Sequence, residues 1–187
     1  MEYAGINALM LNYRAIHGGW HRERAPGLST VADFTEPSLM VPLLRGREAA
    51  AVTTELCSVL QREGRIVNLQ PFCQAVISRE ALSSTAMAPG WALPHARLEG
   101  IPRLTLALGR TSEPLVWFGG ERVSMVFLFA VPEAQAASYL SLISGLARLS
   151  QDRLRLERLG EAPDNLGMFE VLQEIPLARS PAAAVHR

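Results

Sequence analysis

Cysteine is scarce in this sequence, with two residues, Cys57 and Cys73, among 187. They show neither a CxxC spacing nor a neighbouring histidine cluster, which argues against a zinc site or a disulfide scaffold. A single domain of this length buries enough apolar surface to be stable without such cross-links. We therefore expect two reduced thiols on helices in the core of a cytoplasmic protein.

Neither sign of charge is in excess, because 18 Lys and Arg residues balance 18 Asp and Glu residues. A neutral chain lacks the basic surface that attracts proteins to nucleic acid or anionic membranes. Apolar runs are also too short for a membrane helix, which needs roughly 20 residues. The N-terminus has no basic start followed by an apolar stretch, as a signal peptide has. We expect a cytoplasmic protein that neither binds nucleic acid nor inserts into a membrane.

Common cofactor and nucleophile motifs are missing as well. The sequence contains no P-loop, no GxGxxG and no GxSxG. His17 and His21 have the four-residue spacing of a helical metal pair, but the glycines at 18–19 disfavour a helix there. No carboxylate or thiol ligand stands beside them. We predict no metal and no cofactor.

What the sequence does contain is an alternation of helix and strand patterns, which predicts an α/β domain. We expect helices over residues 47–61, 69–80, 136–149, 153–159 and 165–175. We expect strands over residues 39–41, 91–93, 104–108, 116–118 and 123–131. The last strand, VSMVFLFAV, is the most apolar run and is typical of a central strand covered on both faces.

These patterns indicate one domain, a mixed β-sheet flanked by helices on both faces, over residues 34–178. Residues 1–33 show turn formers, mixed charges and no period, and we expect a poorly ordered N-terminal extension there. Residues 179–187 are expected to form a loose C-terminal tail.

The most informative stretch for function runs from Arg79 to His95, REALSSTAMAPGWALPH. Pro94 fixes its own φ and favours an extended Leu93, so a stiff backbone holds His95 at the end of a short apolar strand. A positioned imidazole, with a pKa near neutrality, can act as a nucleophile, a base or a metal ligand. The residues alone leave open a histidine that only satisfies a turn.

This stretch resembles the type-2 IIA domains of the bacterial sugar phosphotransferase system, including the fructose, mannitol and nitrogen-regulatory branches. The resemblance is carried by RE-x-L-x-S-T-x4-G-x-A-x-P-H at 79–95 and by VFLFAVPE at 126–133, and it covers most of the chain after residue 33. It implies that His95 accepts a phosphoryl group from phosphorylated HPr and passes it to a IIB partner. A phosphoprotein donor requires no metal.

The implied reaction suggests roles for residues near His95. The Arg79 guanidinium is always charged and can bind two phosphate oxygens, and Ser84 and Thr85 offer hydroxyl donors. Backbone N–H groups near Gly90 are further candidate donors. Two plainer interpretations stay open: Arg79 as a cation that satisfies the end of its helix, and Thr85 as an ordinary cap.

The sequence departs from the family where a second active-site histidine is expected, because Tyr139 stands there. A phenol can donate a hydrogen bond but carries no positive charge at neutral pH. Tyr139 can also serve only to pack the apolar face of its helix. Ala86 and Ala88 replace two small residues that are usually glycine, and residues 1–33 have no counterpart.

These departures support a second hypothesis besides the phosphocarrier. In it, the domain is a phosphorylation-dependent or degenerate regulatory module, similar to the nitrogen-regulatory branch, with a regulated protein as partner and no role in sugar transport. A third interpretation, a hydrolase that uses His95 as base, lacks an accompanying nucleophile or metal set.

Overall fold

The computed structural model of the chain describes residues 29–177. Its helices are α2 (Ala49–Arg62), α3 (Leu69–Leu82), α4 (Ala136–Leu149), α5 (Arg153–Glu161) and α6 (Asn165–Gln173), with 3-10 turns η1 (Val31–Phe34), η2 (Pro37–Leu39) and η3 (Glu133–Gln135). Its strands are β1 (Met40–Leu44), β2 (Trp91–Ala92), β3 (His95–Arg97), β4 (Thr105–Val116) and β5 (Arg122–Val131). The expected α/β class is confirmed.

The strands form one mixed sheet with the order β1-β4-β5-β2, and β3 pairs with β5 beside β2. Only β4 and β5 are antiparallel, with Thr105 opposite Ala130, and the other pairings are parallel. β5 therefore has neighbours on both sides, and its residues from Met125 to Val131 are all buried. The apolar run at 123–131 is the central strand that its composition predicts.

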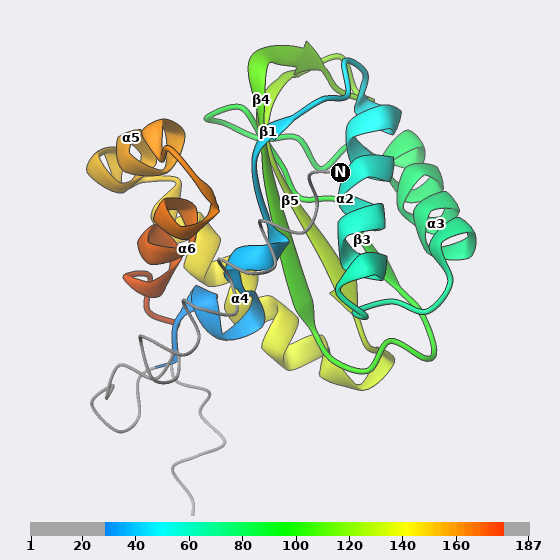
Figure 1. Cartoon of the computed structure of the whole chain (residues 1–187). Coiled ribbons are helices and arrows are strands. Elements are labelled where there is room, and N and C mark those ends of the chain that lie inside the picture. The colour runs from blue at the N-terminus through cyan, green and yellow to red at the C-terminus, as the bar shows by residue number, and fades with distance from the viewer. Residues whose placement is uncertain (1–28, 178–187) are drawn as a thin grey trace, which may run out of the picture.

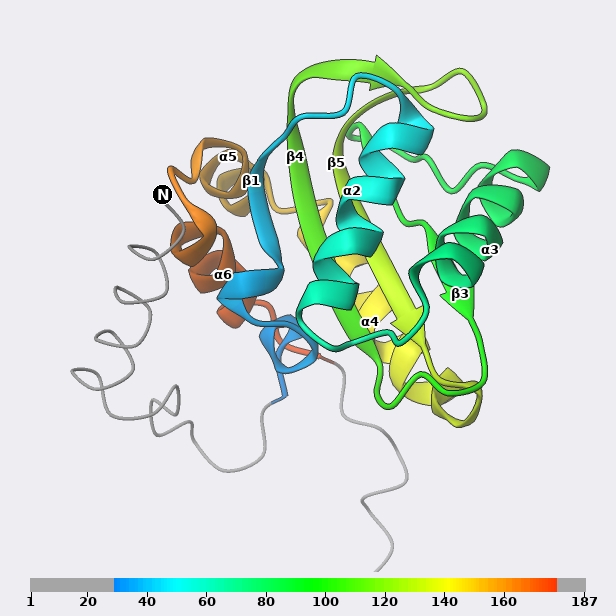
Figure 2. The same ribbon diagram turned by 45° about the vertical axis from the view of Figure 1, so that its right-hand side comes forward.

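Helices cover both faces of this sheet, as Figures 1 and 2 show: α2 and α3 lie on one face, and α4 packs on the other together with α5 and α6. Each long helix buries a stripe of small and apolar residues spaced three and four apart. The inward residues of α4 are Leu142, Gly145, Leu146 and Leu149. These stripes and the sheet form one hydrophobic core.

The strands expected at 39–41 and 104–108 are longer than predicted, and each includes a proline. β1 continues through Pro42 to Leu44, and β4 continues through Pro114 to Val116. β1 is an edge strand, and both strands shift register around their proline, so each proline lies where the regular ladder is interrupted and a missing N–H is tolerated. The separate strand expected at 116–118 is consequently wrong, because β4 ends at Val116 and Trp117 begins the turn.

Packing against the domain begins before residue 34. Val31 is fully buried, and its N–H donates to the Ile175 carbonyl at 3.0 Å. The Leu177 N–H donates to the Ser29 carbonyl at 2.8 Å, which brings the two ends of the described chain together. Of the extension expected at 1–33, the structure describes residues 29–33, and these five residues pack against the folded domain. The pair His17 and His21, the rest of the extension and the tail at 179–187 lie outside the described residues.

Both cysteines are free and buried, Cys57 on α2 and Cys73 on α3. Burial, with a smaller contribution from the neighbouring Cys73, raises the pKa of the Cys57 thiol above its ordinary value. A thiol with a raised pKa is a poor nucleophile, which agrees with a packing role for Cys57. In the part of the chain from 29 to 177, every helix is too short or too polar to cross a membrane.

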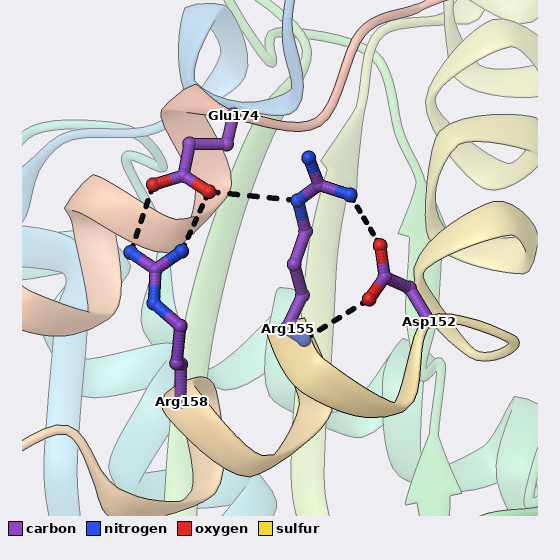
Figure 3. Close-up of polar contacts among 4 residues, drawn as sticks. All are labelled: Asp152, Arg155, Arg158 and Glu174. Atoms are coloured by element: carbon purple, nitrogen blue, oxygen red, sulfur yellow. Dashed lines mark hydrogen bonds and ion pairs between the residues drawn. The ribbon is translucent and has the colours of Figure 1, made fainter.

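Ion pairs join α5 to the end of α6 (Figure 3). Arg158 donates two hydrogen bonds to the Glu174 carboxylate, at 2.7 and 2.8 Å, and Arg155 Nε lies 3.5 Å from the same carboxylate. Asp152 caps α5 by accepting a hydrogen bond from the Arg155 N–H at 3.1 Å. The pair with Arg158 is bidentate, a geometry that holds both side chains in one orientation.

We expect these pairs to make stability depend on pH. The hydrogen bonds from Arg158, and the nearby charges of Arg158 and Arg155, hold the pKa of Glu174 below its ordinary value. A lowered pKa in the folded state stabilises the protein at neutral pH, and this contribution is lost as the pH falls through the folded pKa. The Glu174→Gln variant should therefore unfold at a slightly lower temperature at neutral pH, and the difference should vanish as the pH falls through the folded pKa of Glu174.

The effect should be small, because the pair is exposed to solvent. Glu161→Gln, which removes an exposed glutamate from the end of the same α5, is the matched control for the loss of one negative charge. Thermal unfolding at several pH values measures both variants. If the difference in unfolding temperature between Glu174→Gln and the wild type stays constant with pH, the Glu174 ion pairs do not cause the pH dependence.

Candidate functional site

His95 is the first residue of β3, where it lies opposite Phe129 of the central strand β5. The apolar stretch before it is not one strand: β2 ends at Ala92, and Leu93 and Pro94 connect it to β3. The side chain of His95 is partly buried, and its Nδ1 lies 3.2 Å from the Leu93 carbonyl oxygen. A carbonyl oxygen only accepts, so this contact requires the proton on Nδ1 and leaves a lone pair on Nε2.

Tyr139 lies directly beside His95. The two rings have centroids 5.5 Å apart and planes inclined by 40°, although the residues come from α4 and β3. The phenol ring also packs edge to face on Phe129, with centroids 5.5 Å apart. Tyr139 therefore contributes to packing and also flanks His95, and the two interpretations of this residue are compatible.

The Tyr139 hydroxyl stays protonated at neutral pH. The pKa of this phenol is raised to about 12, mainly by burial; the charge of Arg79 acts to lower it and the charge of Glu80 to raise it, both by less than burial does. A protonated phenol is a hydrogen-bond donor and carries no charge. The influence of Arg79 on this pKa also places the guanidinium in the electrostatic surroundings of Tyr139.

Arg79 lies in the last turn of α3 and is partly buried. Its Nη1 donates a hydrogen bond to the Ser83 carbonyl at 2.8 Å, the residue that ends the helix. The helix-end contact of the plainer interpretation is thus present. It occupies one of five guanidinium donors, which leaves the others for an anion.

The two hydroxyls of the loop after α3 differ in their surroundings. Thr85 Oγ1 accepts a hydrogen bond from the Leu93 N–H at 3.0 Å, next to the connection that carries His95. Ser84 Oγ donates to the Glu121 carboxylate at 3.1 Å and accepts from the Ala86 N–H. Because Glu121 already engages the Ser84 hydroxyl proton, whereas Thr85 Oγ1 acts as an acceptor, these surroundings favour Thr85 over Ser84 as a donor to an anion.

The backbone at Gly90 is engaged in a turn. Its N–H donates to the Met87 carbonyl at 3.0 Å, and its own carbonyl accepts from the Ser124 N–H at 2.8 Å. The φ of Gly90 is +97°, in the region that favours glycine. The N–H groups of Gly90 and Trp91, expected here as phosphate donors, therefore both donate to the Met87 carbonyl instead.

Glu80 is a residue of this site that was not singled out from the sequence. Its side chain is 1% exposed, and its Oε2 accepts hydrogen bonds from Trp117 Nε1 at 2.7 Å and from the Thr85 N–H at 3.1 Å. A signal was available, since Phe72, Val76 and Glu80 follow one another at four-residue spacing on the buried face of α3. A carboxylate on an apolar face is unusual enough to mark a site.

The side chains around His95 form a set suited to an anion. They supply one guanidinium, a phenol and a hydroxyl, and in the neutral imidazole with its proton on Nδ1 the Nε2 atom carries a lone pair. Between residues 29 and 177 there is no group of three or more His, Cys, Asp and Glu side chains arranged to hold a metal.

The sequence model of one family, described as "Phosphoenolpyruvate-dependent sugar phosphotransferase system, EIIA 2", matches residues 39–175. A curated relative, the PTS system 2-O-alpha-mannosyl-D-glycerate-specific EIIABC component of Escherichia coli (strain K12), is 33% identical over 164 residues. The alignment covers 84% of this chain and 25% of the relative. The chain thus spans about a quarter of that protein's length.

Solved structures share the fold. Nitrogen regulatory protein IIA-Ntr from Neisseria meningitidis superposes with a TM-score of 0.66 at 24% identity, covering 76% of this chain and 98% of that one. The structure of enzyme IIAMTL in its complex with phosphorylated enzyme IIBMTL from Escherichia coli superposes with a TM-score of 0.62 at 17% identity. The superposition covers 73% of this chain and 94% of that one. At these identities the likeness establishes the arrangement of strands and helices.

Proposed function

This chain belongs to the EIIA type 2 family of the phosphoenolpyruvate-dependent sugar phosphotransferase system, and from that premise we propose that His95 is its phosphorylation site. In the proposed reaction, phosphorylated HPr donates the phosphoryl group and a IIB component receives it, both in the cytoplasm. Enzyme IIAMTL has the same fold as this chain and forms a complex with phosphorylated enzyme IIBMTL, which supports a IIB partner.

The observation that carries this proposal is the contact between His95 Nδ1 and the Leu93 carbonyl. It holds the neutral imidazole in the tautomer with its lone pair on Nε2. Nε2 attacks the phosphorus, the bond from phosphorus to the donor atom of HPr breaks, and the electron pair leaves with HPr. Nδ1 keeps its proton throughout, and the new N–P bond remains reactive toward the next acceptor.

Neighbouring residues supply the stabilisation that phosphoryl transfer requires, which is mostly positioning and charge. In this proposal Arg79 turns its remaining guanidinium donors toward the phosphoryl oxygens, and the Thr85 hydroxyl proton donates to one of them. Tyr139 donates from its hydroxyl beside the His95 ring. Ser84 takes the secondary position, because Glu121 competes for its hydroxyl proton.

A regulatory role for the same phosphorylation is the second candidate. It is favoured by Tyr139, which occupies the position of the second histidine without the charge of one. In this version phosphorylation of His95 adds about two negative charges and changes which protein docks on the surface around it. Both versions share the first step, so they differ in the acceptor and not in the donor.

Phosphoryl uptake tests the shared step. The protein is incubated with phosphoenolpyruvate, enzyme I and HPr, and its mass is measured before and after. We expect a gain of one phosphate that is labile in acid and stable in base, as a phosphohistidine is. A folded protein that gains no phosphate from an active donor would contradict the proposal and would leave a degenerate binding module.

Position 139 gives a graded prediction for the rate of uptake. Tyr139→Phe removes one neutral hydrogen bond and keeps the ring, so the rate should fall by about twofold to tenfold. Tyr139→His supplies a group that can become charged, and it should speed transfer above the rate of the wild type. Initial rates with phosphorylated HPr measure both. Equal rates in all three proteins would mean that the Tyr139 ring only packs against Phe129.

A further inference from the structure

Glu80 is the most deeply buried charged residue of the site. It follows Arg79 in the last turn of α3, but it belongs to the inward face of the helix, four residues after the fully buried Val76. Placing a carboxyl group there is unfavourable unless hydrogen bonds compensate for the loss of water. An apolar residue of similar size would fill the same space, so the carboxyl group itself needs an explanation.

Its hydrogen bonds supply one. The Glu80 Oε2 atom accepts from the indole of Trp117 and from the backbone N–H of Thr85. Trp117 is 2% exposed and belongs to the turn after β4, so this contact fastens the carboxylate to the rigid sheet side of the protein. The contact with Thr85 then fastens the loop after α3 to the carboxylate.

The hydrogen bonds continue from Thr85 to His95. The Thr85 hydroxyl accepts from the Leu93 N–H at 3.0 Å, and the Leu93 carbonyl accepts from His95 Nδ1 at 3.2 Å. We call Glu80, Thr85, Leu93 and His95 the positioning series. Each member is hydrogen-bonded to the next, and the buried Glu80 carboxylate lies at the opposite end of the series from the imidazole.

We propose that Glu80 is a positioning residue of the phosphorylation site, which acts through Thr85 and Leu93 to keep the His95 proton on Nδ1 and the lone pair on Nε2. The inference rests on the proposed function for its effect on rate. Its effect on the tautomer of His95 is independent of any donor and is measured on the unphosphorylated protein.

The second oxygen of Glu80 fits this role. Oε1 is buried and has no hydrogen-bond partner among residues 29–177. Glu80 therefore meets two donors with one oxygen, which a glutamine can do equally well with its carbonyl. The positioning role thus requires an acceptor at this place and not a negative charge, and the two substitutions Glu80→Gln and Glu80→Ala separate these possibilities.

The first measurement is the tautomer of His95, from two-dimensional 1H–15N spectra of its imidazole in the unphosphorylated protein, assigned with His95→Ala. We expect a single Nδ1–H tautomer in the wild type and in Glu80→Gln. Glu80→Ala leaves the N–H groups of Trp117 and Thr85 without their acceptor, and both tautomers should then be populated. Glu121→Gln is the matched control, since Glu121 holds the same loop through Ser84 and lies outside the positioning series.

The second measurement is the rate of phosphorylation by HPr. Small misplacements of a nucleophile slow transfer by large factors, so Glu80→Ala should lower kcat by about tenfold to a hundredfold. KM for phosphorylated HPr should not change, because a buried side chain does not touch a partner. Glu80→Gln should remain within about fivefold of the wild type.

A folded Glu80→Ala protein with one Nδ1–H tautomer and a normal kcat would overturn the inference and leave the proposed function standing. A wild type that takes up no phosphate would refute the proposed function, and the tautomer comparison would still decide the role of Glu80. If Glu80→Ala fails to fold, the next step of the series can be tested at Thr85. Thr85→Val removes the hydroxyl that accepts from the Leu93 N–H, and Thr85→Ser keeps a hydroxyl there. Identical tautomers in those two variants would equally overturn it.

Discussion

The His95→Ala variant should take up no phosphate at all, while its fold and stability stay close to those of the wild type. The imidazole is the nucleophile of the proposed reaction, and alanine offers no atom that can replace it. His95 is only partly buried and makes one side-chain hydrogen bond, to Leu93, so we expect a change in the free energy of unfolding of about 1 kcal/mol or less.

Mass spectrometry after incubation with the phosphorylated donor measures this loss, and thermal unfolding verifies the fold. The matched control replaces the other three histidines, His17, His21 and His186, and keeps His95. That protein should gain one full phosphate. Labelling that survives in His95→Ala and disappears in the triple variant would move the site out of the described domain.

Much of the fold was predictable because local patterns and tertiary packing agree there. The helix expected at 136–149 coincides with α4, since its apolar stripe is long and has no competing signal. The strands around Pro42 and Pro114 were predicted too short, because a proline is read locally as a breaker. Whether it interrupts a strand depends on edge position and register, which are properties of the assembled sheet.

The site was predictable in part. The motif at 79–95 singles out His95, but that Tyr139 lies 5.5 Å from it depends on how α4 packs against the sheet. Glu80 was missed for a related reason. A lone glutamate near a helix end is usually solvated, and its partner Trp117 is 37 residues away in sequence.

The donors near the phosphate were the least predictable. The sequence offers Ser84, Thr85 and the backbone at Gly90 as equal candidates. The structure distinguishes them only through contacts of their neighbours: Glu121 engages one hydroxyl, and Met87 accepts from the Gly90 N–H. Such differences arise from loop geometry, which composition and periodicity do not encode.

Arg79 should have the second-largest effect on transfer. Its hydrogen bond to the Ser83 carbonyl gives it a structural role at the end of α3, and its proposed role is to bind phosphoryl oxygens. The two roles predict different results. Loss of a helix-end cation lowers the free energy of unfolding by about 0.3–1 kcal/mol and leaves the rate unchanged. Loss of a preorganised cation in the transition state slows transfer by about a hundredfold to a thousandfold.

We expect Arg79→Ala to show the second pattern. Arg79→Lys keeps the charge and can still reach the Ser83 carbonyl, but it lacks the planar fork that binds two oxygens at once. Its rate should fall by about tenfold with little change in stability. Arg97, an exposed arginine two residues after His95 whose guanidinium donates to the Glu133 carbonyl, provides the matched control in Arg97→Ala.

Initial rates with phosphorylated HPr, at low and at moderate salt, separate these cases. Loss of a positive charge slows association with a charged partner. Salt screens this electrostatic contribution to the association rate, so the effect decreases at higher salt in every variant. The rate deficit of Arg79→Lys should persist at moderate salt, because it comes from geometry at the phosphorus and not from net charge. If Arg79→Lys and Arg79→Ala both transfer as fast as Arg97→Ala, the guanidinium serves the end of α3 alone, and His95 would rely on Thr85 and Tyr139 for its stabilisation.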